Sequence, residues 1–319
     1  MTATQRYGIT IPFEGVPLHE HREWFRELAD LGYTDVWSAE SGAHDAFTPL
    51  ALAAAWEPRL RLGTAIVPAY TRGPATLAEC AASLAQAAPG RFALGIGTSS
   101  DVIVERWNAG SFDRPYQRVR DTIRFLRAAL SGEKVSQDYE TFSVRGFRLG
   151  FRLEPEEVPP ILLGALRPGM LRLAGTEADG AIVNWLSADD VRVVAPHVGE
   201  GKEVAARIFV MPSEDRDTVN MVAKRALAAY LNVPVYRAFH EWLGRDSLRG
   251  MWDAWAAGDR AAAVEAIPDS VVDELVVHGS GEECRAHIQR YIDNGVTTPA
   301  PAIFPFGMEL RDAVRALAP

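Results

Sequence analysis

The sequence is poor in lysine and in cysteine. Its only lysines are Lys134, Lys202 and Lys224, and none of them ends a predicted core strand. A Schiff-base barrel enzyme needs a desolvated lysine that projects into its active site, so this class of enzyme is disfavoured. The two cysteines, Cys80 and Cys284, lie far apart in separate helical patterns, and we expect them to pack against neighbours rather than to pair.

Several sequence features that would indicate other functions are also missing. No apolar run approaches the length of a membrane span, and the amino terminus lacks the charged start and long apolar segment of a secretory signal. The formal net charge is −9 and no basic block occurs, which disfavours a nucleic-acid partner. The histidines are scattered without an HExxH motif or a Cys/His cluster, and no GxSxG motif is present. We therefore expect a cytoplasmic protein that uses neither a metal ion nor a serine nucleophile and binds neither nucleic acid nor a membrane.

The sequence does contain a repeated alternation of short apolar runs and helical patterns. Several of the runs are continuously apolar, as in strands that are buried on both faces. The runs predict strands at residues 6–12, 34–39, 60–67, 91–97, 160–165, 180–184, 206–211 and 300–305. Helical patterns occur at residues 18–31, 47–57, 74–88, 115–131, 168–177, 187–196 and 280–294. Closing the sheet satisfies such an alternation best, so we predict an α/β fold, a single (β/α)8 TIM-barrel domain over residues 1–319.

Two stretches interrupt the alternation and are interpreted as insertions into the barrel. Residues 132–158 alternate polar and apolar positions with turn residues between them, which predicts a surface hairpin. Residues 212–275 are helical in pattern and contain Trp242, Trp252 and Trp255. This second insertion has two possible roles. In one it forms a wall or lid of the substrate cleft, and one of its tryptophans would then stack on the substrate. In the other it extends the core or forms a dimer interface.

Small residues gather where predicted strands turn into helices, which is the end of a barrel that carries the active site. The tracts are Gly95 to Ser100 (GIGTSS) and Gly164 to Gly169 (GALRPG). Such turns let backbone amides approach an anion, and the helix that follows adds its partial positive charge. Tight turns also need glycine for steric reasons alone, so these tracts indicate an anion site only weakly.

Three longer tracts, in order along the chain, carry a resemblance to a known family. They are LRLGTAIVPAYTRGP, RFALGIGTSSDVIVERW and ILLGALRPGMLRLAGTEADGAIVNW, and the tract GSGEECRAHIQRYIDNGV near the carboxyl end continues the match. Together they resemble the luciferase-like superfamily. Within it they resemble the branch of deazaflavin (coenzyme F420)-dependent oxidoreductases that includes methylenetetrahydromethanopterin reductase and the deazaflavin-type glucose-6-phosphate dehydrogenase.

The resemblance implies that the barrel mouth holds coenzyme F420 and that hydride moves between its ring and a small organic substrate. It places a non-prolyl cis peptide, here Ala65-Ile66, behind the ring. It implies that Arg167 neutralises the phosphate or the oligoglutamate tail, although an arginine at the start of a surface helix is often simply solvated. The remaining residues that it places along the cofactor are Ser41, Gly97, Thr98, Ser99, Gly164, Ala165, Leu166 and Asn184. It also implies a homodimer.

The sequence departs from the sugar-phosphate dehydrogenase branch at the expected proton donors. That branch has an Asp-His pair where this chain has Glu40 and Ser41, and a Glu where this chain has Ser100. Hydride delivery to C=O or C=C requires a proton on the adjoining atom, and burial raises the pKa of a carboxylic acid. The candidate donors that remain near the mouth are Glu40, His44, Asp101 and Tyr70. Each of the four is more typical of a helix cap, an ion pair or a surface group than of a catalytic acid.

Two alternative functions remain open at this point. An FMN-dependent luciferase-like monooxygenase would share the fold and would activate oxygen, which a deazaflavin does not do because it carries carbon at the position where reduced flavin forms its peroxide. A non-catalytic F420-binding protein would retain the cofactor site without the acid, in agreement with the missing His and Glu.

Overall fold

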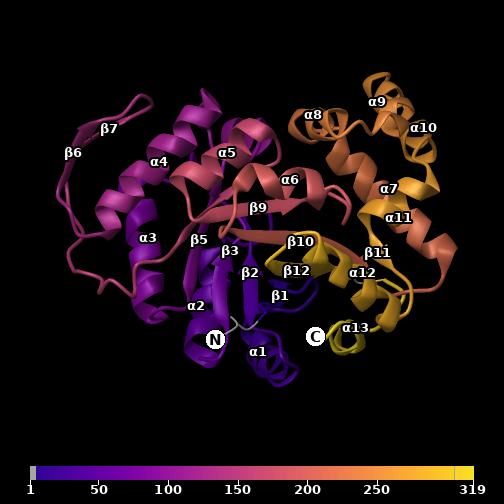
Figure 1. Ribbon diagram of the computed structural model, residues 1–319, viewed down its shortest axis with the longest axis horizontal. Coiled ribbons are helices and arrows are strands. Elements are labelled where there is room, and N and C mark those ends of the chain that lie inside the picture. The colour runs from indigo at the N-terminus through magenta and orange to yellow at the C-terminus, as the bar shows by residue number, and fades with distance from the viewer. Residues whose placement is uncertain (1–4, 305) are drawn as a thin grey trace.

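The computed structural model describes residues 5–304 and 306–319 and forms a barrel of parallel strands surrounded by helices (Figure 1). The eight strands that make up the barrel are β1 (Gly8–Ile11), β2 (Asp35–Ser38), β3 (Arg61–Thr64), β5 (Phe92–Gly97), β8 (Ile161–Gly164), β9 (Gly180–Asn184), β10 (Glu203–Met211) and β12 (Thr298–Ile303). They pair in chain order, and β12 packs beside β1. The predicted α/β TIM-barrel fold is confirmed. Residue 305, the last of the predicted eighth strand, lies outside the described residues.

Helices cover the outer face of the sheet because each carries an apolar stripe. In α1, for example, Trp24, Phe25 and Leu28 are buried at helical spacing. The surrounding helices are α1 (His21–Asp30), α2 (Phe47–Trp56), α3 (Pro74–Ala87), α4 (Pro115–Leu130), α5 (Pro168–Glu177), α6 (Val191–Val198), α12 (Gly281–Asp293) and α13 (Leu310–Ala316). The last of these and the short helix η1 (Leu18–Glu20) were not expected as separate elements.

Several predicted boundaries are wrong, and at two of them the local cause is visible. The third strand was expected to run through residues 60–67, but it divides into β3 and β4 (Val67–Pro68). Between these two pieces the Ala65 amide donates to Ser38 at 2.7 Å, so the chain leaves the regular ladder while its amide stays paired. The helix expected at residues 187–196 begins later, because the side chains of Ser187 and Asp190 bond to each other's backbone amides at 3.1 and 2.8 Å ahead of α6.

The two interrupting stretches lie on opposite sides of the barrel in Figure 1. Strands β6 (Val135–Asp138) and β7 (Ser143–Phe147) pair antiparallel and project from one side. On the other side lie the short strand β11 (Val277–His278), which pairs in parallel with the end of β10, and a cluster of helices with its own apolar core. These helices are α7 (Arg216–Leu231), α8 (Pro234–Trp242), η3 (Asp246–Leu248), α9 (Arg249–Ala256), α10 (Arg260–Glu265) and α11 (Asp269–Leu275).

The amino-terminal end of the barrel interior is filled by an indole and closed by buried charges. Trp37 occupies space that Gly63 leaves free, since a Cβ atom at Gly63 would lie 2.3 Å from the Trp37 ring. Arg61 donates to both carboxylate oxygens of Glu203 at 2.7 and 2.8 Å and to Asp35 at 3.0 Å. These bonds join β2, β3 and β10, whose opposite ends carry the cavity described below.

We predict that the Glu203→Gln variant is less stable than the wild type by about 3 kcal/mol at pH 7, because it leaves Arg61 short of a counter-charge. Burial raises the pKa of Glu203, but the hydrogen bonds and positive charge of Arg61 outweigh burial and hold that pKa below its ordinary value. A lowered folded-state pKa adds stability above the unfolded-state pKa, and this stability is lost as the pH falls. Urea unfolding should therefore show a wide gap between the two proteins at pH 7 that narrows below about pH 4. A gap that is the same at both pH values would contradict this role of Glu203.

Candidate functional site

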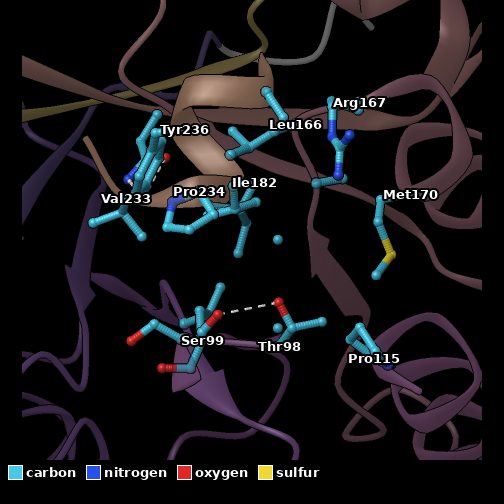
Figure 2. Close-up of a pocket in the computed structure, with 18 of the residues that line it drawn as sticks. Thr98, Ser99, Pro115, Leu166, Arg167, Met170, Ile182, Val233, Pro234 and Tyr236 are labelled. Atoms are coloured by element: carbon cyan, nitrogen blue, oxygen red, sulfur yellow. Dashed lines mark hydrogen bonds between the residues drawn. The ribbon is translucent and has the colours of Figure 1, made fainter. Parts of the chain in front are cut away.

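A cavity of about 940 Å³ opens at the carboxyl ends of the barrel strands (Figure 2). Its walls come from the residues that end or follow β2, β3, β5, β8 and β9, from β10, and from α5 and α8. The sequence places small residues at several of these strand ends, which leaves the mouth open above the packed barrel interior. A cavity of this volume accommodates a large cofactor together with a small second molecule.

The Ala65–Ile66 peptide forms one surface of the cavity. Its bond is cis, as the resemblance implied. The Ile66 side chain lies between two glycines, because a Cβ atom at Gly97 would lie 3.0 Å from its Cγ1 and one at Gly164 would lie 3.2 Å from its Cγ2. The Ile66 carbonyl accepts a hydrogen bond from the Glu40 amide at 3.2 Å. The glycines at the ends of β5 and β8 thus leave room for the Ile66 side chain, which forms an apolar surface that a flat ring can cover.

Hydroxyl groups follow this apolar surface at the end of β5. Thr98 donates to the Ser99 carbonyl at 3.3 Å, as Figure 2 shows, and Ser99 has a φ of +62°. Positive φ is uncommon for residues other than glycine and is concentrated at functional sites. Ser100 accepts from the Ile103 amide at 3.3 Å and so begins the π-helix η2 (Val102–Trp107). The turn presents polar groups along one edge of the cavity.

The amino terminus of α5 forms another part of the wall. Pro168 is the first helical residue and Arg167 precedes it with extended backbone, so the unpaired amides of the first turn, beginning at Gly169, face outward from the helix end. The Arg167 side chain is exposed at the rim, on the same side as Met170 in Figure 2. A helix terminus with an adjacent guanidinium is suited to bind a phosphate.

Helix α8 closes the side of the cavity that faces the β5 turn. Figure 2 shows Val233, Pro234 and Tyr236 across from Ser99. The Asn184 amide, at the end of β9, donates to the Tyr236 hydroxyl at 3.1 Å, and that hydroxyl lies 3.3 Å from Asn184 Oδ1. Burial raises the pKa of Tyr236, so its phenol keeps its proton at neutral pH. The insertion therefore forms a wall of the cleft, which was one of the two expected arrangements.

Arg207 and the two tyrosines of this wall were missed by the sequence analysis. Arg207 lies on β10 and lines the cavity beside Tyr230 and Tyr236. The signal was an arginine inside an otherwise apolar stretch, residues 206–211. The alternation of side chains along a strand directs position 207 to the inside of the barrel. Trp242 also lines the cavity, whereas Trp252 packs in the core of the insertion.

The predicted cofactor residues all line this one cavity. They are Ser41, Ala65, Ile66, Gly97, Thr98, Ser99, Gly164, Ala165, Leu166, Arg167 and Asn184. They come from five strand ends that are far apart in the sequence, and the fold brings them together.

The four candidate proton donors are not equivalent in the structure. Asp101 lines the cavity. Glu40 also lines it, but its carboxylate accepts from Arg72 at 2.6 and 2.7 Å and from the Ala46 amide at 3.2 Å, so it is occupied as an acceptor. His44 is exposed and is not among the lining residues.

Tyr70, the fourth candidate donor, lies in a separate hollow of about 290 Å³ with Arg118. Its hydroxyl donates to the Asp113 carbonyl at 2.6 Å. Burial raises the pKa of Tyr70 to about 12. Of the four candidates, only Asp101 and Glu40 therefore face the main cavity.

The described ranges, 5–304 and 306–319, contain neither a metal-binding cluster nor a membrane-spanning helix. Within them no group of three or more His, Cys, Asp or Glu side chains is placed to hold a metal ion. In the same residues, no helix combines the length and the apolar character that crossing a membrane requires.

Comparisons with known proteins agree with this geometry. Residues 3–298 match the family model described as luciferase-like monooxygenase. A Mycobacterium tuberculosis protein provisionally named a coenzyme F420-dependent oxidoreductase is 28% identical, over 93% of this chain and 94% of its own. The 5,10-methylenetetrahydromethanopterin reductase of Methanolobus tindarius is 27% identical, over 86% of this chain and 87% of its own. The structure of the coenzyme F420-dependent tetrahydromethanopterin reductase of Methanopyrus kandleri superposes with a TM-score of 0.81, at 19% identity, over 99% of this chain and 98% of that one.

Proposed function

The chain belongs to the luciferase-like monooxygenase family, and from this premise we propose that it is a coenzyme F420-dependent oxidoreductase that acts on a small organic molecule. The observation that carries the proposal is the single cavity that collects all eleven predicted cofactor residues at the carboxyl ends of the strands. The names of the similar proteins favour coenzyme F420 over other cofactors.

The lining residues fit the cofactor in shape. A planar tricyclic ring is matched by the apolar surface at Ala65 and Ile66, which the glycines at positions 97 and 164 leave uncovered. The hydroxyls of Thr98 and Ser99 lie along the edge of this surface and are suited to a polar chain. The volume of about 940 Å³ exceeds what the ring alone requires, so a substrate also has room.

The charged end of the cofactor is matched by α5. The first-turn amides of this helix, near Gly169, would receive its phosphate, and Arg167 would supply a positive charge at the rim. The exposed position of Arg167 also suits a tail that extends out of the cavity.

When bound, the deazaflavin supplies a hydride donor or acceptor at its ring. The chain's own residues then have to position the substrate, exclude water and handle one proton. Helix α8 shields the side of the cavity opposite the β5 turn, and Tyr236 holds a proton there in a hydrogen bond with Asn184. We propose the Tyr236 hydroxyl as the group that exchanges this proton with the substrate; Asp101, on the β5 side, is the other protic group that we retain from the sequence analysis.

The proposal is tested by titrating the purified protein with oxidised F420 and, separately, with FMN, while following the fluorescence of each cofactor. We expect F420 to bind at least about 10-fold more tightly than FMN, a difference of about 1.4 kcal/mol in binding free energy. The reverse preference would favour the oxygen-using flavin monooxygenases that give the family its description. Binding of neither cofactor would contradict both functions.

The Arg167→Gln variant should bind F420 about 10-fold more weakly than the wild type, because it loses one partly exposed, charge-assisted contact to the phosphate or the tail. Arg172→Gln is the matched control, since Arg172 is exposed one turn further along α5 and does not line the cavity. Both variants carry the same net charge. Equal affinity of the two variants for F420 would remove Arg167 from the cofactor site.

A further inference from the structure

Arg207 is a half-buried cation with no counter-charge in the part of the chain that the structure describes. It lies on β10, lines the cavity, and its Nε atom is buried without a hydrogen-bond partner. Among the described residues, no carboxylate forms an ion pair with its guanidinium. Charged groups that leave water are normally paired, because losing hydration without gaining a partner is unfavourable.

The immediate surroundings of Arg207 are neutral. Its guanidinium carbon lies 4.9 Å from the centre of the Phe209 ring. In the sheet it stands opposite Asn184, whose amide is bonded to Tyr236. Burial lowers the pKa of Arg207, and the nearby phenols of Tyr230 and Tyr236 oppose this shift. An arginine remains protonated in proteins, so the positive charge persists at neutral pH.

The carboxylates that line the same cavity belong to other parts of its wall. Glu40 follows β2 and is already paired with Arg72 through both of its oxygens. Asp101 precedes η2 on the β5 side. Neither carboxylate forms an ion pair with Arg207. Because Arg207 lines the cavity, a bound ligand can supply the missing negative charge.

We propose that the ligand at the Arg207 end of the cavity is an organic monocarboxylate and that Arg207 binds its carboxylate. One guanidinium balances one negative charge, and its planar fork matches the two oxygens of a carboxylate. A doubly charged phosphate would need a second cation, whereas the other arginine of the cavity, Arg167, lies at the rim, immediately before α5. Naming this compound as the substrate rests on the proposed function, but its binding to Arg207 does not.

The rest of the compound should be mostly apolar. Ile182, Val233 and Pro234 lie together with Tyr236 in Figure 2 and line the cavity. Polar groups near Arg207 are the amide of Asn184 and the phenols of Tyr230 and Tyr236. A short apolar body would then lie between this wall and the surface formed by Ala65 and Ile66. That position places the compound beside the proposed ring site.

The test uses calorimetry on the full-length protein without added cofactor. It compares the binding of three acids with that of their uncharged amides; the acids are acetate, benzoate and cinnamate. For at least one pair we expect the acid to bind the wild type at least about 10-fold more tightly than the amide. Arg207→Gln should abolish this preference. Arg237→Gln is the control, because Arg237 is exposed on α8 and paired with Glu241 at 2.9 Å, and it should retain the preference.

Two results of the binding measurements would overturn the proposal. One is that the wild type shows no preference for acid over amide, or that the Arg207→Gln variant keeps this preference. The other concerns the cofactor: Arg207→Gln should bind F420 within about threefold of the wild type, and a loss beyond about 10-fold would assign Arg207 to the cofactor instead. Failure of F420 to bind the wild type would contradict the proposed function and leave the carboxylate measurement valid.

A stability measurement separates this role from a structural one. Because Arg207 is half-buried without a counter-charge and its Nε atom is buried without a partner, replacing it with an apolar side chain of similar length should raise the midpoint of thermal unfolding. Arg207→Met should therefore unfold at a higher temperature than the wild type, and benzoate should raise the midpoint of the wild type alone. A lower midpoint for Arg207→Met would indicate that Arg207 stabilises the fold, and would overturn the proposal.

Discussion

Gly95→Ala is expected to prevent the chain from reaching its native barrel, or to lower the free energy of unfolding by at least about 4 kcal/mol. A Cβ atom at Gly95 would lie 1.9 Å from the Thr64 carbonyl oxygen and 2.4 Å from the Ile182 Cδ1. The backbone cannot move aside, because the Thr64 hydroxyl bonds to both the amide and the carbonyl of Gly95, at 2.7 and 2.8 Å. The soluble yield and the urea unfolding curve of the variant measure the effect.

The matched control for this variant is Gly150→Ala. A Cβ atom at Gly150 meets no atom within 4 Å, and the position does not have positive φ. Alanine there should leave stability unchanged or raise it by less than about 1 kcal/mol, since it reduces the freedom of the unfolded chain. Similar behaviour of the two variants would contradict the tight approach of β5 to β3 beneath the cavity.

Arg245→Met is expected to lower the free energy of unfolding by about 3 to 5 kcal/mol, because it breaks a buried charge network. The Arg245 side chain is only 8% exposed. It bonds to Asp190 at 2.8 Å, to Glu274 at 2.9 Å and to the His240 ring at 2.7 Å. It thereby links the start of α6 to α8 and α11, and so holds the wall-forming insertion against the barrel. Denaturant unfolding followed by circular dichroism measures the loss.

Arg249→Met is the control for Arg245→Met. Arg249 pairs with Asp246 at 2.7 Å, but both side chains are at least 70% exposed. Exposed pairs of this kind contribute little, so the loss should stay below about 0.5 kcal/mol. If Arg249→Met destabilised the protein as much as Arg245→Met, burial would not be what gives the Arg245 network its importance.

The barrel could be predicted from the sequence because its strands are short, buried on both faces and separated by helical patterns. The start of α6 and the end of β3 were predicted wrongly, because side chains or backbone amides there form hydrogen bonds outside the regular helix and sheet pattern. Ser187 and Asp190 delay α6 by bonding to each other's amides, and the chain turns out of the ladder at Ala65 while its amide stays paired. Such local exchanges leave no trace in hydrophobic periodicity.

The two sides of the cavity differ in how well they could be predicted. The β3, β5 and β8 side follows from tracts such as GIGTSS and GALRPG, because tight turns and an exposed helix terminus restrict the choice of residues. The opposite side depends on how an insertion docks. Tyr236 meets Asn184 across 52 positions of sequence. Pairing over such separations follows from the docking of whole elements, which no local pattern specifies.

The most direct test of the proposed function is a crystal structure of the protein with oxidised F420. We predict that the ring covers Ala65 and Ile66, that the phosphate lies at the first-turn amides of α5 near Arg167, and that space remains beside Arg207. A ring bound away from the Ala65–Ile66 peptide, or a phosphate held by Arg207, would contradict the proposed cofactor site.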